Sequence, residues 1–204
     1  MTLEPIIQKS FTIIDREVGE HELNPQEYAI ARRVIHSTAD FDYLKLLEFN
    51  HNAISSATDI LKYGIPIVTD VTMVRQGIRT MVAKTFDNPI IAAIDLAQKA
   101  IPGKTRAETG LLRCWSKYPD AVYVIGNAPT ALTALCECIK QQDGDDKIIP
   151  PLVIGAPVGF VSVKESKQAL RQLKIPQIIV KGRKGGSPVA AAILNALLVL
   201  AKEV

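Results

Sequence analysis

The sequence predicts an α/β fold in three layers, in which helices cover both faces of a five-stranded parallel sheet. Short runs of β-branched residues alternate with longer stretches of helical periodicity, and this alternation is typical of parallel sheets. Most runs are apolar throughout, which is the pattern of strands that are buried on both faces. The five runs are residues 65–71, 89–94, 121–125, 152–154 and 177–180.

The length and composition predict one domain over residues 1–204. The chain has 204 residues, of which 48% are hydrophobic and 22% are charged. A chain of this length can bury about 70% of the surface that its unfolded form exposes, so its core needs neither disulfides nor structural metals. We expect residues 1–63 to be mainly helical and residues 64–204 to carry the alternation of strands and helices.

Two helices are predicted in the N-terminal segment. The first opens at residues 24–27 (NPQE), where asparagine is a good N-cap, proline fits the first turn and glutamate completes a capping box. It is expected to run to about His36. A second helix is expected over residues 43–63, ended by Gly64 and Pro66.

The longest apolar run lies near the C-terminus. It covers the 13 residues 189–201 and is interrupted by Asn195, so it is shorter than the ~20 residues that span a bilayer. The start of the chain also lacks the basic and then apolar pattern of a signal peptide. We therefore expect a buried helix here, no membrane association and no export.

The charge and the cysteine content exclude other classes of protein. The chain has 24 Lys and Arg against 21 Asp and Glu, a net charge of +3, which is too even for a dedicated nucleic-acid binder. Three cysteines suggest no disulfide framework and favour a cytoplasmic location. With three histidines and no H-x-x-x-H or C-x-x-C spacing, we expect no catalytic metal.

The segments that follow three of the runs suggest a site for an acidic ligand. They are residues 126–130, 155–159 and 181–188, which are rich in glycine and proline, and each is predicted to open directly into a helix. Ligands of open parallel sheets bind at the carboxyl ends of the strands, where helix N-termini favour anions. Three such loops, with Arg183 and Lys184 in the last, suggest a large, multiply acidic ligand. The alternative is that these loops are ordinary turns between strands and helices.

Known nucleotide motifs are incomplete. The segment 103–105 (GKT) resembles the end of a P-loop, but Gln98 stands where the first glycine is required. No G-x-G-x-x-G follows a strand. Arg106 is a candidate for carboxylate contacts, because a guanidinium offers a bidentate fork.

A candidate general acid lies near the end of the first predicted helix. Arg32 and Arg33 precede His36 by four and three residues, so all three could face a common region. The helix C-terminus favours the imidazolium and the arginines oppose it, so we expect the pKa of His36 to stay near neutral, as suits a general acid. The alternative is a histidine that only caps the helix.

At these residues the chain resembles the precorrin-8X methylmutase family, which includes the cobalt-precorrin-8 methylmutases of cobalamin biosynthesis. One departure is Ala39, where many relatives carry glycine, and it concerns the local turn geometry. The matching segments are residues 33–41 (RVIHSTADF), 69–77 (TDVTMVRQG), 125–132 (IGNAPTAL), 154–161 (IGAPVGFV) and 182–187 (GRKGGS).

The resemblance implies a flavodoxin-like homodimer that binds a corrinoid, with active sites near the subunit interface. It implies an isomerase that moves a methyl group between adjacent carbons of ring C, giving hydrogenobyrinate or its cobalt form, cobyrinate, without a cofactor. His36 matches the catalytic histidine, and Ser10 and Arg33 match substrate-contacting positions. We expect Arg33 and Asp40 to set the orientation and pKa of His36. The other expected pocket residues are Thr69, Asp70, Arg75, Arg106, Asn127 and Thr130.

Two other functions remain open at this point. A corrinoid carrier would keep the anion-binding loops but would have no use for a proton donor at His36. A nucleotide-dependent transferase or oxidoreductase on the same fold is disfavoured by the incomplete phosphate motifs.

Overall fold

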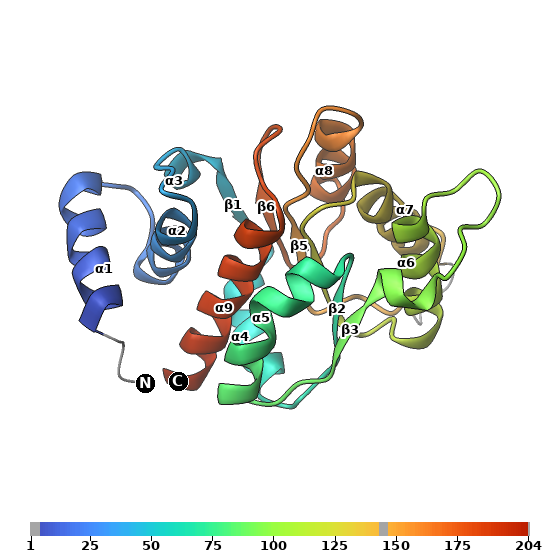
Figure 1. The fold of residues 1–204 in the computed structure, drawn as a ribbon, viewed down its shortest axis with the longest axis horizontal. Coiled ribbons are helices and arrows are strands. Elements are labelled where there is room, and N and C mark those ends of the chain that lie inside the picture. The colour runs from blue at the N-terminus through green and yellow to red at the C-terminus, as the bar shows by residue number, and fades with distance from the viewer. Residues whose placement is uncertain (1–4, 143–146, 204) are drawn as a thin grey trace.

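The apolar runs of the sequence become the strands of one sheet. The computed structural model describes residues 5–142 and 147–203, and its fold is drawn in Figure 1. The strands are β1 (Leu47–Asn50), β2 (Ile67–Thr69), β3 (Ile90–Ala92), β4 (Val122–Ile125), β5 (Val153–Gly155) and β6 (Gln177–Val180). Their order in the sheet is β1-β6-β5-β4-β2-β3, and all neighbours are parallel except β1 and β6.

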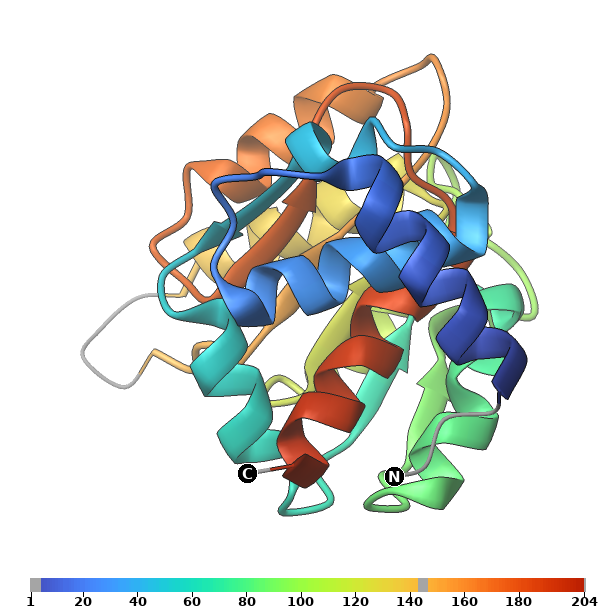
Figure 2. The same ribbon diagram turned by 90° about the vertical axis from the view of Figure 1, so that its left-hand side faces the viewer.

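Helices cover both faces of this sheet. The helices are α1 (Pro5–Val18), α2 (Pro25–Thr38), α3 (Tyr43–Leu46), α4 (Ala53–Leu61), α5 (Thr72–Lys84), the 3₁₀ helix η1 (Ala93–Leu96), α6 (Arg106–Lys117), α7 (Pro129–Lys140), α8 (Val163–Arg171) and α9 (Ser187–Glu203). One layer holds α2, α4, α5 and α9, with α1 packed on α2 (Figure 2). The other layer holds η1, α6, α7 and α8.

Strand β4 shows why its run is apolar at every position. Val122 and Val124 join the core on the α9 side, whereas Tyr123 and Ile125 join the core on the α7 side. All four side chains are fully buried. A strand that is covered on both faces has no position for a solvated side chain. Each of the five runs contains a strand, as predicted, although β3 is only partly buried.

Helix α9 lies in the centre of its layer, between α2 and α5 (Figure 1). Most of its side chains are buried, as predicted from the run at residues 189–201. Across the part of the chain that the structure describes, no helix combines the length and the apolar character needed to cross a membrane.

The capping box at the start of α2 is confirmed. The Asn24 side chain accepts hydrogen bonds from the backbone N–H groups of Gln26 and Glu27, and the Glu27 carboxylate accepts one from the backbone N–H of Asn24. At the other end, Ala39 adopts a left-handed conformation with φ 53° and donates its N–H to the Ile35 carbonyl. This is the turn geometry at which glycine is usually found.

The single helix expected over residues 43–63 is wrong. The chain forms α3, then strand β1, then α4, and His51 and Asn52 make the intervening turn with φ of 53° and 57°. Strand β1 pairs antiparallel with β6, whose edge would otherwise present unpaired backbone groups. The sheet is therefore mixed and six-stranded, not a parallel sheet of five strands.

The loops at the carboxyl edge also differ in part from the prediction. The turn after β4 leads directly into α7 at Pro129, but a longer loop separates Gly155 from the start of α8 at Val163. A second loop joins β6 to α9, and the N–H of Gly186 donates to the Ala156 carbonyl (2.8 Å). These two loops therefore support each other.

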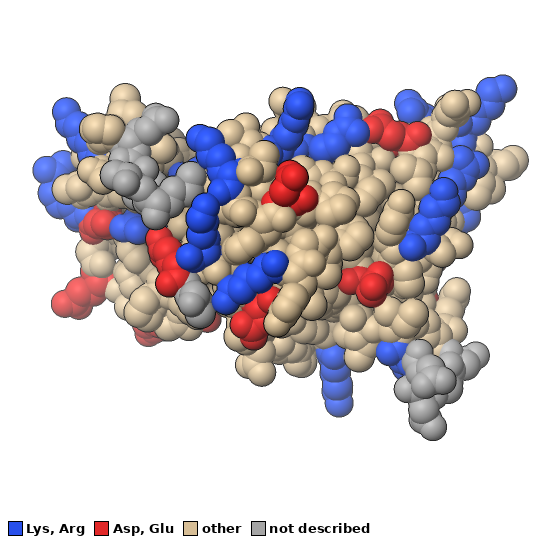
Figure 3. Space-filling view, turned by 90° about the horizontal axis from the view of Figure 1, so that it is seen from below, with Lys and Arg blue, Asp and Glu red and all other residues tan. Residues whose placement is uncertain are grey.

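The face that Figure 3 shows carries both basic and acidic side chains among neutral ones, with the basic ones more prominent toward its two ends. This distribution fits the small net charge of +3.

Candidate active site

The carboxyl ends of β2 and β4 are joined through Asp70. Its carboxylate accepts hydrogen bonds from the backbone N–H groups of Gly126 (3.0 Å), Asn127 (2.7 Å) and Ala128 (2.7 Å). The side chain is fully buried, and burial raises its pKa although these bonds oppose the shift. The N–H groups that were expected to bind a ligand anion are thus occupied by a carboxylate of the protein itself. Asp70 supports the site from inside and does not line it.

Two of the expected threonines lie at the same edge. Thr69 is fully buried, and its hydroxyl donates to the carbonyl of Val71 (3.2 Å). The hydroxyl of Thr130 lies 2.8 Å from that of Thr105, the N-cap of α6. Thr69 is therefore a structural residue, whereas the half-buried Thr130 stands at the surface beside the exposed Asn127.

The two arginines expected at this edge already have partners. Arg75 forms an ion pair with Asp95 (2.5 Å). The Nε of Arg106 donates to the Ala97 carbonyl (3.1 Å), although the residue is exposed. Both lie near the ends of β2 and β3, and the described contacts hold them against the protein.

His36 lies half-buried in the last turn of α2. Its ring packs edge-on against Phe11 of α1, with the ring centroids 5.4 Å apart. Burial lowers the pKa of His36 below its ordinary value, and the nearby positive charge of Arg33 lowers it further. Arg33 opposes the imidazolium, as expected, but burial is the larger cause of the shift and was not part of the expectation. At neutral pH the imidazole of the free protein is uncharged.

Asp40 does not act on His36 in the way that was expected. Its carboxylate accepts a hydrogen bond from Lys184 (2.6 Å), which also contacts Asp42 at the same distance. This bond lowers the pKa of Asp40. Asp40 thus ties the end of α2 to the loop between β6 and α9, while the causes of the His36 pKa shift are burial and Arg33.

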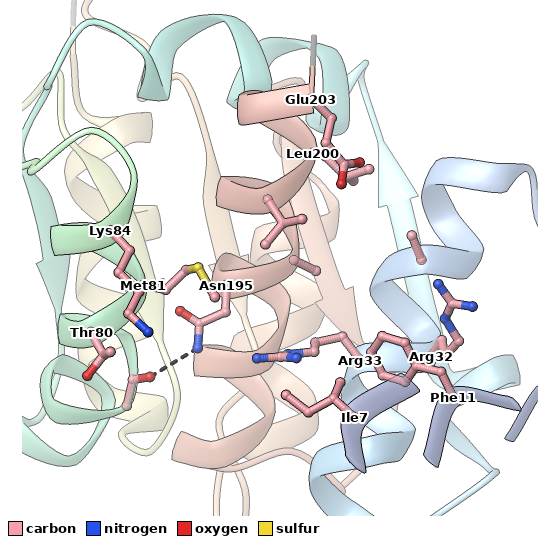
Figure 4. A pocket seen from close by; sticks show the side chains of 14 residues that line it. Ile7, Phe11, Arg32, Arg33, Thr80, Met81, Lys84, Asn195, Leu200 and Glu203 are labelled. Atoms are coloured by element: carbon pink, nitrogen blue, oxygen red, sulfur yellow. Dashed lines mark hydrogen bonds between the residues drawn. The ribbon is translucent and has the colours of Figure 1, made fainter. Parts of the chain in front are cut away.

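Arg33 faces a cavity of about 430 Å³ between α2, α5 and α9, which α1 borders (Figure 4). Its guanidinium is half-buried, and burial lowers its pKa. Within residues 5–142 and 147–203 it pairs with no carboxylate. Among the described residues, the other cations on the cavity wall are Arg32 and Lys84, and the acid is Glu203.

Arg32 differs from Arg33 in its contacts. It forms an ion pair with Asp15 (2.9 Å) and lies 4.4 Å from the centroid of the Phe11 ring. Arg32, Arg33 and His36 do face a common region, as expected: Arg32 and Arg33 line the same cavity, and Arg32 and His36 both contact Phe11. Their roles differ, because Arg32 also holds α1 against α2 through Asp15. Ser10 of α1 donates its hydroxyl to the Ile6 carbonyl one turn back (2.9 Å).

Sequence reasoning missed the part of the cavity wall that α5 and α9 supply. Thr80 and Lys84 of α5 and Asn195 of α9 line it together with Arg33 (Figure 4). The Asn195 amide nitrogen donates to the Gly77 carbonyl (3.0 Å), whereas its oxygen is buried without a partner in the described part of the chain. The signal was available, because Asn195 is the one polar residue inside an otherwise apolar run.

The arrangement suits a ligand with an apolar body and several carboxylates. The cavity falls within the ~300–1,000 Å³ of small-molecule sites, and its wall combines Ile7, Met81 and Leu200 with more cations than acids. Among the described residues no group of three His, Cys, Asp or Glu side chains could hold a metal ion. The fold and the site thus define an α/β small-molecule enzyme with a half-buried histidine beside an arginine that is free to bind an anion.

Comparison with known proteins assigns the chain within that class. Residues 5–200 match the family described as precorrin-8X methylmutase. The chain is 56% identical to the cobalt-precorrin-8 methylmutase of a Synechocystis strain, over 97% of this chain and 95% of that protein. It is 37% identical to the precorrin-8X methylmutase of a Sinorhizobium species, over 94% of this chain and 92% of that protein.

A solved structure agrees with this assignment. The crystal structure of precorrin-8X methyl mutase from Thermus thermophilus superposes with a TM-score of 0.87 at 37% identity, covering 98% of both chains. The chain belongs to the precorrin-8X methylmutase family and is an isomerase.

Proposed function

We propose that the protein moves a methyl group between adjacent ring C carbons of precorrin-8X or cobalt-precorrin-8, giving hydrogenobyrinate or cobyrinate. The observation that carries the proposal is the match of nearly the whole chain to the methylmutase family. We favour the cobalt-containing corrinoid as the natural substrate, because the identity of 56% is to a relative named for that form, and the relative named for the metal-free form is 37% identical.

His36 is the proposed proton donor, and Arg33 the proposed carboxylate ligand. The imidazole is uncharged in the free protein because burial and Arg33 lower its pKa. A bound carboxylate on Arg33 would neutralise that charge, and further ligand carboxylates would raise the pKa of His36 toward neutrality. Binding of an acidic macrocycle would thus favour the protonated form of His36 in the complex.

The chemistry then requires one proton transfer and one bond exchange. His36 donates a proton to the conjugated macrocycle, at a ring nitrogen in the metal-free form and at another atom of the conjugated system in the cobalt form, whose ring nitrogens bind the metal. The proton draws electron density toward the atom that receives it, and the C–CH₃ bond breaks at one carbon as a new bond forms at its neighbour. Because substrate and product are isomers, the proton that His36 gives must be matched by one that is released. The step needs an acid and a fixed ring orientation, which proximity supplies.

We further propose that this enzyme is a single flavodoxin-like domain and a cytoplasmic homodimer. The parallel strands run in the order β3-β2-β4-β5-β6, which supports a flavodoxin-like architecture. All three cysteines are free, which supports a reducing compartment.

The proposed dimer has support from exposed apolar side chains at one edge of the sheet. Met73, Phe160 and Val161 follow carboxyl ends of strands and are 66%, 85% and 81% exposed, which supports a partner surface at that edge. Sedimentation equilibrium tests the dimer.

The absorbance of the corrinoid tests the activity directly. Purified protein is mixed with precorrin-8X and, separately, with cobalt-precorrin-8, and the time course is compared among wild type, His36→Ala and His51→Asn. His51 is exposed in the turn between β1 and α4, so its variant is a matched control, and asparagine tolerates the left-handed backbone there.

We expect wild type and His51→Asn to convert substrate, and His36→Ala to be slower by about 10²–10⁴-fold. If His36→Ala retains more than about a tenth of the wild-type rate, the acid role is untenable. A shifted spectrum without conversion of either corrinoid would favour a carrier. A thermal shift with nucleotides, but not with corrinoids, would favour a nucleotide-dependent enzyme.

A further inference from the structure

Lys167 is a buried cation that the proposed chemistry does not use. The side chain lies on α8 and is 3% exposed. Its ammonium donates to the backbone carbonyls of Gly182 (2.9 Å) and Lys184 (2.7 Å), and no described carboxylate lies within ion-pair distance. Burial lowers its pKa to about 8. A buried charge without an acidic partner is costly, so the presence of a lysine at this buried position requires an explanation.

The two carbonyls belong to the loop between β6 and α9. The carbonyl between them, that of Arg183, accepts the N–H of Gly159 (3.3 Å) from the neighbouring loop. Three successive carbonyls are thus held from within the protein. Their bonds leave the side chains of Arg183 and Lys184 at the surface, where both are exposed.

These two side chains stand at the edge of the sheet where α2 ends. Lys184 contacts Asp40 and Asp42, which directly follow α2. Arg183 lies 5.7 Å from the ring centroid of the exposed Phe160 and has no ion pair among the described residues. A guanidinium beside an exposed aromatic ring suits the carboxylate rim and the apolar body of one ligand.

We infer that Lys167 is a positioning residue that fixes the loop between β6 and α9, so that Arg183 is presented to the corrinoid carboxylates. This inference rests on the proposed function for the identity of the ligand, but the fixing of the loop is independent of it. An amine has two N–H bonds even when it is uncharged, so Lys167 holds both carbonyls in either protonation state.

Lys167→Met tests the inference, with Lys164→Met as its matched control. Methionine fills a similar volume without a donor, and Lys164 lies one turn earlier on α8 with its side chain exposed. Amide hydrogen exchange, read by mass spectrometry over residues 181–187, measures the hold on the loop. We expect exchange to be about tenfold faster in Lys167→Met and unchanged in Lys164→Met. If Lys167→Met does not fold, Lys167→Gln, whose shorter amide cannot reach both carbonyls, is expected to give the same result.

Steady-state kinetics test the functional part. We expect Lys167→Met to raise KM for the corrinoid about tenfold and to leave kcat within about twofold of the wild-type value. The reason is that the loop would bind the substrate and the transition state equally well. A merely structural loss would lower the active fraction, and hence kcat, at unchanged KM. The double variant Lys167→Met/Arg183→Met should raise KM by less than the product of the two single increases, because both substitutions act on the same contact.

The outcomes separate this inference from the proposed function. Unchanged exchange over residues 181–187 in folded Lys167→Met would overturn the inference, and faster exchange with an unchanged KM would overturn its functional part. If the wild type converts neither corrinoid, the proposed function fails, while the exchange data still decide whether Lys167 fixes the loop.

Discussion

Replacing Asp70 should show how much its buried carboxylate contributes to the stability of the protein. In Asp70→Ala three backbone N–H groups, those of Gly126, Asn127 and Ala128, lose their acceptor. Hydrogen bonds to a charged group contribute ~1.5–3 kcal/mol each, but the net loss is smaller than their sum. Burial raises the pKa of Asp70 in spite of these bonds, so the desolvation of the carboxylate offsets part of what they contribute.

We therefore expect Asp70→Ala to lower the free energy of unfolding by about 3–5 kcal/mol, mainly because the three backbone N–H groups are left without an acceptor. For a domain of this size the melting temperature should fall by about 6–20 °C. Asp70→Asn keeps an oxygen but turns an amide N–H₂ toward at least one of the donors, so we expect a smaller loss of about 1–3 kcal/mol.

Urea denaturation, followed by circular dichroism and by Trp115 fluorescence, measures these differences. Asp59→Ala is the control, because Asp59 is an exposed aspartate on α4 and its removal should change stability by less than about 0.5 kcal/mol. The reasoning is refuted if Asp70→Ala lies within about 1 kcal/mol of this control at an unchanged denaturant slope.

Four further results are expected. Ala39→Gly should raise the free energy of unfolding by about 0.5–1 kcal/mol in urea denaturation, because Ala39 has φ 53° and glycine adopts that conformation without strain. Gly110→Ala should lower the melting temperature markedly, because its Cβ would lie 2.0 Å from the Ala93 carbonyl oxygen; an unchanged value contradicts the packing of α6 on η1. Arg33→Lys should raise KM about tenfold with little change in kcat, since an ammonium cannot replace the bidentate fork; equal KM values would remove Arg33 from the binding site. The pH profile of kcat/KM should fall as pH rises through the His36 pKa, which is below its ordinary value of 6.5, because the protonated form is required; a flat profile counts against this acid.

The strands and the first turn of α2 could be predicted because their causes are local. A run such as residues 121–125 is apolar at every position, and its short length and its valines and isoleucine favour a strand covered on both faces over a buried helix. The capping box at Asn24 and Glu27 is likewise a matter of four consecutive residues. Helical periodicity extended the second helix across residues 47–50, because the partner that makes them a strand, β6, lies more than a hundred residues away.

The candidate site was predictable in its residue types but not in their roles. Asp70 and Asn127 do meet at one edge of the sheet, as the topology requires. The sequence could not show that the Asp70 carboxylate satisfies the N–H groups there, because that depends on the distance between two loops. The cavity beside Arg33 also needed the structure, since α5 and α9 supply much of its wall.

The position of Arg33 connects ligand binding to the state of His36. Its positive charge disfavours the imidazolium, and in the described part of the chain no carboxylate neutralises it. A ligand that supplies this carboxylate removes the repulsion and brings further negative charge, so the same contact that holds the ligand favours protonation of His36. In the proposed mechanism, the free protein thus keeps His36 uncharged, and only a multiply acidic ligand reverses both effects together. By the same proposal, a neutral macrocycle of the same shape would bind without supplying negative charge and would leave His36 uncharged.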